Sequence, residues 1–456
     1  MRDIVFLALL PLMLYAMFKR PFIALGMWIW TAMFFPNAWV YGPAQSLRYN
    51  LMFTGITILG YIVLKEKPKV SWGKIGGLVF LFFLWTAISS VTTIGALGTT
   101  GDILFRFFKV VMLFVFVVLI VDKKLHIDFF LWCVVLSIGF YGSLEALKFV
   151  ASGGGHKIEG FAGHVLGDRN ELALSFVMIL PICAYLLGEY GRESKWVRFG
   201  LLGLMGLLVT AVVGTQSRGG LISILGLAAY MFMKSNRKGL LGTLAVILVV
   251  ALSALVSEEW LSRMDTIGEA KQDASFMGRV VAWKMSFIMA AQNPFFGGGF
   301  KALETPVVWL ALSQDFNSYP FFYTADAFPD PYFARAAHSV YFQVLGEHGF
   351  VGLAIYLMMV GTAFMKVRRV AAKVKRYKGP EWIATLATML QLVIFAFCLG
   401  GAALSFAYFE LVYAVFGLIL VLETRILPRF IDDKPVAPPK KYDGIPVPGR
   451  PSLHRI

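Results

Sequence analysis

The stretch GLLGTLAVILVVALSALV, residues 239–256, carries no charged side chain. As an α-helix, with a rise of ~1.5 Å per residue, it nearly spans the ~30 Å hydrocarbon core of a bilayer. Inside that core each backbone N–H and C=O needs a partner within the chain, and a helix supplies one. The stretch therefore predicts a membrane-spanning helix.

The composition extends this prediction to the whole chain of 456 residues. Hydrophobic residues make up 58% and charged residues only 15%, and the mean hydropathy is +0.72, well outside the range of soluble domains. The apolar segments do not alternate strictly between polar and apolar residues, as the strands of a membrane barrel would. We therefore expect an all-α, polytopic integral membrane protein.

Apolar segments recur along the chain, and the first two are short. They form either two thin crossings or one broken crossing, so we expect about 12 or 13 transmembrane helices. No small-residue cleavage site follows the first segment, which favours a retained membrane segment over a signal peptide. The segments are residues 4–18, 21–36, 49–64, 75–93, 103–122, 127–150, 170–188, 196–213, 219–233, 239–256, 340–365, 382–400 and 405–424.

Lysine and arginine cluster in every second connection between these segments, which places those connections in the cytoplasm by the positive-inside rule. The long connection at residues 257–337 then lies outside. It holds six Lys/Arg and nine Asp/Glu, so the net charge of +15 arises elsewhere in the chain. The basicity is an orientation signal, and it gives no reason to expect nucleic acid as a partner.

This pattern divides the chain into five parts. We expect transmembrane helices in residues 1–150 and 151–256, a large external loop domain in 257–337, the C-terminal transmembrane helices in 338–425 and a disordered, basic cytoplasmic tail in 426–456. All three cysteines lie inside apolar runs, which indicates small core residues and not disulfides or metal ligands: Cys133, Cys183 and Cys398.

Arg218 is the most informative polar residue on the outward side. It lies in GTQSRGGLIS (214–223), a short turn between two apolar helices, where the positive-inside rule disfavours arginine. Two glycines follow it and let the backbone approach closely. A guanidinium stays charged and donates in a planar fork, which suits a half-buried phosphate.

Three other outward segments carry polar side chains next to apolar helices. SGGGHKIEGFAGHVLGDRNELALS (152–175) brings Arg169 and Asn170 to the start of a helix. SFMGRVVAWKMSFIMAAQNPFFGGGF (275–300) predicts a helix with Arg279, Trp283 and Lys284 along it, ended by Asn-Pro and three glycines. ARAAHSVYFQVLGEHG (334–349) places Arg335 and His338 before the next apolar run.

Each of these residues also has a plain structural interpretation. A single arginine at a helix end, such as Arg169 or Arg335, is usually a snorkelling anchor. His156 and His164 lie in a glycine-rich loop and are expected to be solvated, whereas His348 can simply bond to backbone. His126 and His454 fall on the cytoplasmic side of this topology.

Three of these segments, in this order, resemble the O-antigen ligase and polymerase superfamily of bacterial envelope glycosyltransferases. That family combines an SRGG-type arginine, a G-R-x-x-x-W segment with an N-P-x-x-G-x-G turn, and an H-S/N-x-(Y/F) histidine with a downstream G-x-x-G. The resemblance covers about residues 160–365. RPFIALGMWIWTAMFFPNAW (20–39) resembles the subgroup labelled O-glycosylation ligases.

The resemblance implies a GT-C-like membrane glycosyltransferase at the periplasmic face of the bacterial inner membrane, with its C-terminus cytoplasmic. It would transfer O-antigen from an undecaprenyl-diphosphate-linked donor to the lipid A core, among membrane lipids and without a cofactor. Polysaccharide polymerase and protein O-oligosaccharyltransferase remain alternatives with the same donor. A lipid-linked glycan flippase is an alternative of another class, supported by Glu145 and Glu410 inside apolar helices.

The resemblance also implies roles for the outward residues. Arg218 and Arg279 would clamp the diphosphate and, because the outward loops contain no D-x-D motif, would replace a metal ion. Asn170, Trp283 and the helpers Arg169 and Arg335 would bind substrate.

The same resemblance makes His338 the general base of an inverting transfer. Its ordinary pKa of ~6.5, lowered further by nearby arginines, would keep it neutral. It could instead cap the next helix or orient the diphosphate. The aromatic residues 316–333 are either packing contacts or a guide for the polyprenyl chain.

Overall fold

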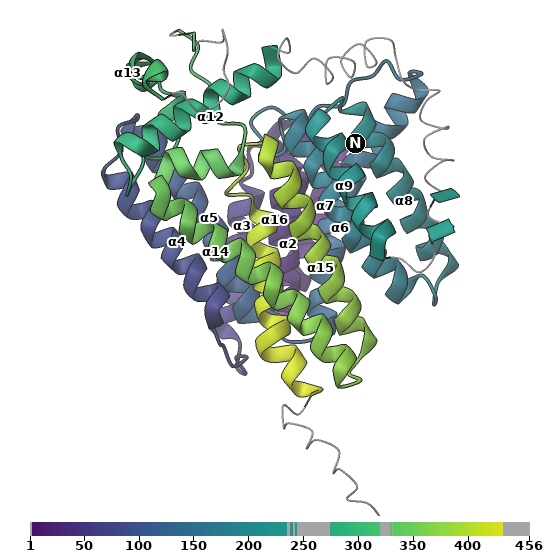
Figure 1. Cartoon of the computed structure of the whole chain (residues 1–456). Coiled ribbons are helices and arrows are strands. Elements are labelled where there is room, and N and C mark those ends of the chain that lie inside the picture. The colour runs from purple at the N-terminus through teal and green to yellow at the C-terminus, as the bar shows by residue number, and fades with distance from the viewer. Residues whose placement is uncertain are drawn as a thin grey trace, which may run out of the picture.

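A computed structural model describes residues 2–234, 238–239, 242–243, 274–319, 329–330 and 332–431. These residues form a bundle of helices with a smaller layer at one end (Figure 1), and no β-strand occurs among them. The helix expected at 239–256, most of the expected tail and part of the aromatic segment 316–333 lie outside the described residues.

Every expected apolar segment within the described residues coincides with a helix. The helices are α1 (Arg2–Lys19), α2 (Pro21–Phe34), α3 (Tyr49–Val63), α4 (Gly73–Val91), α5 (Leu97–Ile120), α6 (Lys124–Ala151), α7 (Arg169–Tyr190), α8 (Lys195–Gly214), α9 (Arg218–Lys234), α12 (Ala274–Gln292), α13 (Pro306–Gln314), α14 (Val340–Arg376), α15 (Glu381–Gly400) and α16 (Glu410–Val421). Short 3₁₀ turns and one π-turn connect or extend them: Pro36–Ala38, Gly42–Ser46, Ala302–Glu304, Phe316–Ser318, Gly401–Ala403, Leu422–Ile426 and Leu427–Arg429.

The described helices make the chain an all-α, multi-pass membrane protein. Within the described ranges, eight helices are long and apolar enough to cross a bilayer, and three shorter apolar helices accompany them: Pro21–Phe34, Tyr49–Val63 and Arg218–Met233. The expected total of 12 or 13 crossings stays a prediction. The helix expected within residues 275–300 is confirmed as Ala274–Gln292, and it ends immediately before Asn293 and Pro294, where the proline disfavours its continuation.

Helix α7 lies in the interior of the bundle, which determines where its first residues end up. In the span of α7, 78% of the residues are buried, whereas in that of α8 only 33% are buried. Gly400 at the end of α15 touches α7 so closely that a Cβ there would lie 2.5 Å from Leu174 Cδ1 and from Ser223 Oγ of α9. The starts of α7 and α9 are therefore held together near the end of α15.

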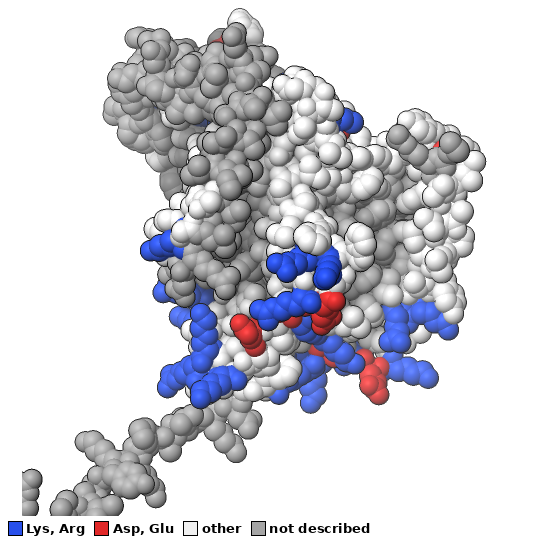
Figure 2. Space-filling view, turned by 90° about the vertical axis from the view of Figure 1, so that its right-hand side faces the viewer, with Lys and Arg blue, Asp and Glu red and all other residues white. Residues whose placement is uncertain are grey.

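A separate layer covers the end of the bundle where α7 and α9 begin. This cap layer contains α12, α13 and the segments that connect them (Figure 1). It has a small hydrophobic core of its own, which includes Met285, Ile288, Trp309 and Leu312. On the face seen in Figure 2, Lys and Arg gather toward the opposite end, where α16 finishes in Figure 1.

Two glycine-rich turns lock the cap layer onto the bundle. Gly298 N–H donates to Gly346 O at 2.8 Å, and Gly299 N–H donates to Glu347 O at 2.9 Å. A Cβ on Gly297 (φ +65°) would lie 2.4 Å from Gly346 O, so no larger residue fits without moving backbone. We call residues 294–299 and 346–350 the glycine clamp.

The clamp also corrects one expectation about α14. The apolar run at 340–365 is not one continuous helix, because Gly349 (φ 69°, ψ −173°) interrupts it. Phe350 N–H, just after the break, donates to Pro294 O at 2.9 Å. The break lets the clamp hold the start of α14 against the cap layer, about three turns after His338.

Candidate functional site

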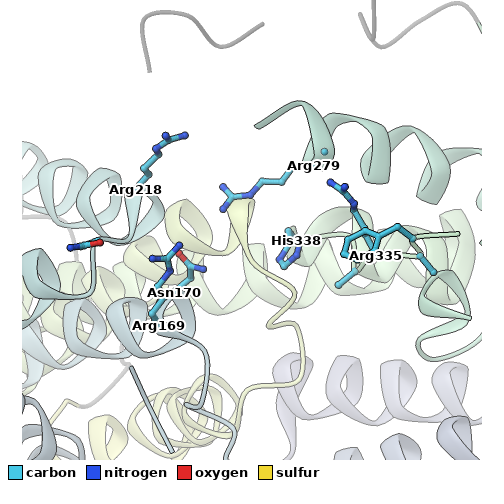
Figure 3. A pocket seen from close by; sticks show the side chains of 11 residues that line it. Arg169, Asn170, Arg218, Arg279, Arg335 and His338 are labelled. Atoms are coloured by element: carbon cyan, nitrogen blue, oxygen red, sulfur yellow. The ribbon is translucent and has the colours of Figure 1, made fainter. Parts of the chain in front are cut away.

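A cavity of about 710 Å³ lies between the bundle and the cap layer (Figure 3). It brings together six of the seven residues that the sequence singled out as site residues. Its lining consists of Arg169, Asn170, Gln216, Arg218, Gly278, Arg279, Phe333, Ala334, Arg335, Ala336 and His338. Trp283, the seventh, does not line it.

The bundle wall of the cavity consists of Arg169, Asn170, Gln216 and Arg218. Arg169 is the first residue of α7 and Arg218 the first of α9. A helix N-terminus carries partial positive charge and free N–H groups, which favour an anion. Two such ends, each with an arginine at its first position, make this wall suitable for a phosphate.

Hydrogen bonds tie the two helix ends together. Asp168 caps α7 by accepting the Asn170 N–H at 2.7 Å. Ser217 does the same for α9, accepting the Gly220 N–H at 3.1 Å, and its hydroxyl also donates to Asn170 Oδ1 at 2.7 Å. Because caps fix the direction of a helix start, this chain of bonds sets the positions of both arginines.

The bundle wall contains one residue that the sequence analysis missed. Gln216 lies two residues before Arg218, adopts a left-handed backbone (φ 53°) and is buried. Within the described part of the chain, Gln216 Oε1 and Arg169 Nη1 are buried atoms without a hydrogen-bond partner. Unpaired buried polar atoms are costly, so a ligand in the cavity would relieve this cost. The only available signal was its place in the GTQSRGG motif.

The cap wall consists of Gly278, Arg279, residues 333–336 and His338. In Figure 3 the Arg279 side chain reaches from the cap layer toward the bundle wall, with His338 beside it. The guanidinium of Arg335 lies over the Phe333 ring, 4.8 Å from its centroid. A Cβ on Gly278 would be 2.1 Å from Arg335 Nη1, so a glycine at 278 is what leaves room for this guanidinium.

His338 has an uncommon backbone conformation. Its φ is +46°, a left-handed value that costs energy for most residues and often marks functional sites. Its backbone N–H donates to Ser405 Oγ at 2.8 Å. The N-cap of α14 is Ser339, without a side-chain cap hydrogen bond, so the alternative that His338 caps this helix is wrong.

Burial and positive charge lower the pKa of His338. Desolvation is the largest cause, followed by the charge of Arg279, with a smaller contribution from Arg335, whereas Asp168 and Glu304 act in the opposite direction. The direction agrees with the sequence-based expectation, although burial and not arginine is the main cause. At neutral pH the ring is therefore neutral and able to accept a proton.

Positive charges crowd the cavity. Burial, and then repulsion by Arg218, lower the pKa of Arg279, against a weaker opposing effect of Asp168. An arginine remains charged despite such a shift, so the repulsion persists in the ligand-free protein. A bound dianion would remove it, and this favours a diphosphate-bearing ligand over a neutral one.

Two expected cap-layer residues have packing roles. The Trp283 ring stacks on Phe342 with 5.3 Å between ring centroids and 7° between planes. Lys284 is buried, with its Nζ 4.0 Å from the centroid of Phe316. Trp283 therefore supports the base of α14 and has no direct access to the cavity.

The histidines expected to be solvated, or bonded only to backbone, have specific partners instead. His164 is half-buried, lies 2.8 Å from Ala32 O and stacks on Phe35. His348 is buried, with Nδ1 2.6 Å from Ser89 Oγ and Nε2 2.8 Å from the Tyr408 hydroxyl. His156 forms a pair with Glu145, described next. The expectation of solvation was wrong for His164, which tertiary contacts half-bury, whereas the His156 side chain stays 34% exposed. The expectation of a backbone partner was wrong for His348, whose ring contacts two side-chain hydroxyls.

The two glutamates that supported a transporter have different surroundings. Glu145 Oε1 pairs with Lys148 and its Oε2 with His156, both at 2.7 Å, which gives it a structural explanation. Glu410 Oε2 is buried and has no partner among the described residues. Nor do those residues contain a group of three or more His, Cys, Asp or Glu placed to hold a metal ion.

Two family models match this chain. Residues 201–357 match the family described as O-antigen ligase, a segment that contributes Gln216, Arg218 and the whole cap wall to the cavity. Residues 1–190 match a family of unknown function, and this segment includes Arg169 and Asn170. A comparison with curated proteins gave no match.

Proposed function

Because this chain belongs to the O-antigen ligase superfamily through residues 201–357, whose members carry out membrane glycosyl transfer, we propose that it is an O-antigen ligase. In this proposal it transfers a polysaccharide from an undecaprenyl-diphosphate donor to the lipid A core at the periplasmic face of the inner membrane. The transfer inverts the anomeric centre and needs no metal ion.

One observation carries the proposal: four arginines and a neutral histidine line a single cavity next to two helix N-termini. The arginines come from positions as distant in sequence as 169 and 335, so their convergence is a property of the fold. A cavity with this charge suits a diphosphate, and its size can admit a sugar beside it.

In the proposed reaction His338 accepts the proton of the acceptor hydroxyl. The acceptor oxygen then forms a bond to the anomeric carbon while the bond from that carbon to the diphosphate oxygen breaks. The electron pair of the broken bond leaves with the lipid diphosphate. Because attack and departure occur on opposite sides of one carbon, the configuration inverts in a single step.

The arginines stabilise the leaving group. Arg218 and Arg279 come from opposite walls, and we assign them the two ends of the diphosphate, with Arg169 and Arg335 as auxiliary donors. Preorganised donors that face developing charge are each worth about 10²–10³ in rate. The charge repulsion stored between Arg279 and Arg218 is relieved when the donor binds.

The test is transfer by the purified protein with an undecaprenyl-diphosphate glycan, offered lipid A core, a second copy of the glycan or an acceptor protein, each with and without EDTA. We expect transfer to the lipid A core that is insensitive to EDTA and absent in His338→Ala. Transfer only to glycan would identify a polymerase, and transfer only to protein an oligosaccharyltransferase. Movement of the donor across a vesicle membrane without any transfer would indicate a flippase.

A further inference from the structure

We propose that Ser405 is a positioning residue that fixes His338 in its catalytic orientation. This inference rests on the proposed function, in which His338 is the general base. Ser405 belongs to the turn between α15 and α16 and comes from a part of the sequence 67 positions away from the histidine. It is not among the residues that line the cavity.

Among the described residues, no hydrogen bond orients the His338 ring itself. A catalytic histidine is usually held by a hydrogen bond from its second ring nitrogen to a carboxylate or carbonyl. In the described part of the chain, the only hydrogen bond of His338 runs from its backbone N–H to Ser405 Oγ. The ring direction therefore depends on the backbone.

The hydrogen bond to Ser405 also holds an uncommon backbone conformation of His338. At φ +46°, His338 is in a region that is costly for a side chain with a Cβ. Such a conformation persists only when surrounding contacts stabilise it. The Ser405 hydroxyl accepts the backbone N–H of His338, whose direction depends on the φ of His338. The hydrogen bond therefore stabilises the left-handed conformation directly.

Hydrogen bonds of neighbouring residues fix the turn that carries Ser405. Two residues further along the same turn, Ala407 N–H donates to Gln343 Oε1 at 3.1 Å. Next, the Tyr408 hydroxyl donates to Glu347 Oε2 and contacts His348 Nε2 at 2.8 Å. The turn is thus attached at several points to the first part of α14, which begins two residues after His338.

The same network reaches the glycine clamp and helix α4. Glu347 Oε1 accepts the Lys301 N–H at 3.0 Å, and His348 Nδ1 lies 2.6 Å from Ser89 Oγ. Glu347 and His348 are buried, where satisfied polar networks hold a unique arrangement. The turn that carries Ser405 therefore connects His338 to a buried, hydrogen-bonded polar cluster near the cavity.

The test compares Ser405→Ala, which removes the acceptor, with Ser405→Thr, which keeps it. Ser313→Ala is the matched control, because the Ser313 hydroxyl donates to Leu310 O in α13, outside the cavity lining. We expect Ser405→Ala to lower kcat by at least about tenfold, since small misplacements of a catalytic group are costly. KM for the lipid-linked donor should not change, and Ser405→Thr should restore most of the rate.

The pH profile adds a readout that a purely structural role would not move. Without Ser405 the His338 ring should become more hydrated, which raises its pKa toward ~6.5. The acid limb of kcat would then move to higher pH in Ser405→Ala but not in Ser313→Ala. If Ser405→Ala unfolds more easily, Ser405→Cys replaces it, because the thiol has a similar volume and is a weaker acceptor. Ser405→Cys should show a smaller loss of kcat and a smaller shift of the acid limb.

The outcomes separate this inference from the proposed function. If His338→Ala is inactive while Ser405→Ala keeps the wild-type kcat and pH profile, only the role of Ser405 is overturned. A rise in KM with kcat unchanged, or failure of a folded Ser405→Thr variant to recover, would overturn it as well. If His338→Ala retains activity, His338 is not the general base, and both that part of the proposed function and the role of Ser405 are wrong.

Discussion

The bundle wall takes its arginines from the first positions of α7 and α9, whereas the cap wall takes Arg335 and His338 from an irregular segment. Side-chain caps and the Ser217–Asn170 hydrogen bond hold the first wall. Glycine turns, backbone hydrogen bonds and a left-handed histidine hold the second.

This difference suggests a division of labour. Helix ends in a packed bundle can hold fixed charges precisely, which suits the constant part of a donor, its diphosphate. The cap wall carries the one proton acceptor proposed for the reaction and joins the bundle through the glycine clamp. A change in the clamp can therefore move the cap wall without moving the bundle wall. The predictions below test each wall in turn.

After the complete loss of transfer expected for His338→Ala, the largest effect is expected in the bundle wall. Arg218→Ala should lower kcat/KM by about 10²–10³, because the diphosphate loses a preorganised donor. Arg218→Lys should recover only part of the loss, since an ammonium keeps the charge but not the planar fork. Steady-state transfer assays measure both. If Arg218→Lys has the kcat/KM of the wild type, the contact with the diphosphate is not bidentate. If Arg218→Ala has the kcat/KM of the wild type, Arg218 has no role.

The glycine clamp should matter for both stability and activity. Gly297→Ala places a Cβ 2.4 Å from Gly346 O and 2.6 Å from His348 N, so the cap layer must shift. We expect a lower unfolding temperature and a turnover lower by about tenfold or more, because the cap wall moves against the bundle wall. Gly361→Ala, where a Cβ meets nothing within 4 Å, is the control. Equal behaviour of the two variants would contradict the clamp.

A smaller effect is expected in the pH dependence. The base must be neutral, so activity falls as pH decreases through the pKa of His338, which burial and then Arg279 and Arg335 hold below its ordinary value. Removing one positive charge in Arg335→Gln should raise this pKa and move the acid limb to higher pH, by less than about one unit because burial remains.

Gly278→Ala should act in the same direction with a smaller shift, because its Cβ would displace the Arg335 guanidinium. The measurement is kcat against pH for wild type, Arg335→Gln and Gly278→Ala. A limb that moves to lower pH in either variant would mean that Arg335 does not act on His338 by its charge.

Chelation of divalent metal ions is expected to have no effect on turnover. Incubation with EDTA followed by gel filtration should leave turnover unchanged, because the arginines supply the positive charge near the leaving group. Atomic absorption of the purified protein is the companion measurement. Loss of activity that returns on adding a divalent cation would show that the bundle wall works with a metal ion.

The sequence predicted most of the fold and the composition of the cavity. In a membrane protein, hydrophobic segments predict the positions of helices directly, because each backbone N–H and C=O in the bilayer needs a hydrogen-bond partner within the chain. Arg218 could be identified because arginine is disfavoured at an outward helix end. Hydrophobic periodicity could not predict that Arg169 and Arg279 line the same cavity. That prediction came from the resemblance to the family.

Other features could not have been found from the sequence. Whether Trp283 faces the cavity or Phe342 depends on the rotation of α12, which a short amphipathic pattern does not fix. The left-handed backbone of His338 depends on Ser405, a residue far away in the sequence and without a motif of its own. The break at Gly349 depends on the clamp, whose partners lie in two segments separated by α13.

The most direct test of the account measures donor binding and transfer separately. Binding of undecaprenyl-diphosphate glycan to His338→Ala and to Arg218→Ala is compared with wild type, alongside turnover of each. The account predicts that His338→Ala binds the donor as wild type does but transfers nothing, while Arg218→Ala binds at least about tenfold more weakly. Loss of donor binding in His338→Ala, or wild-type binding in Arg218→Ala, would contradict the assignment of the two walls.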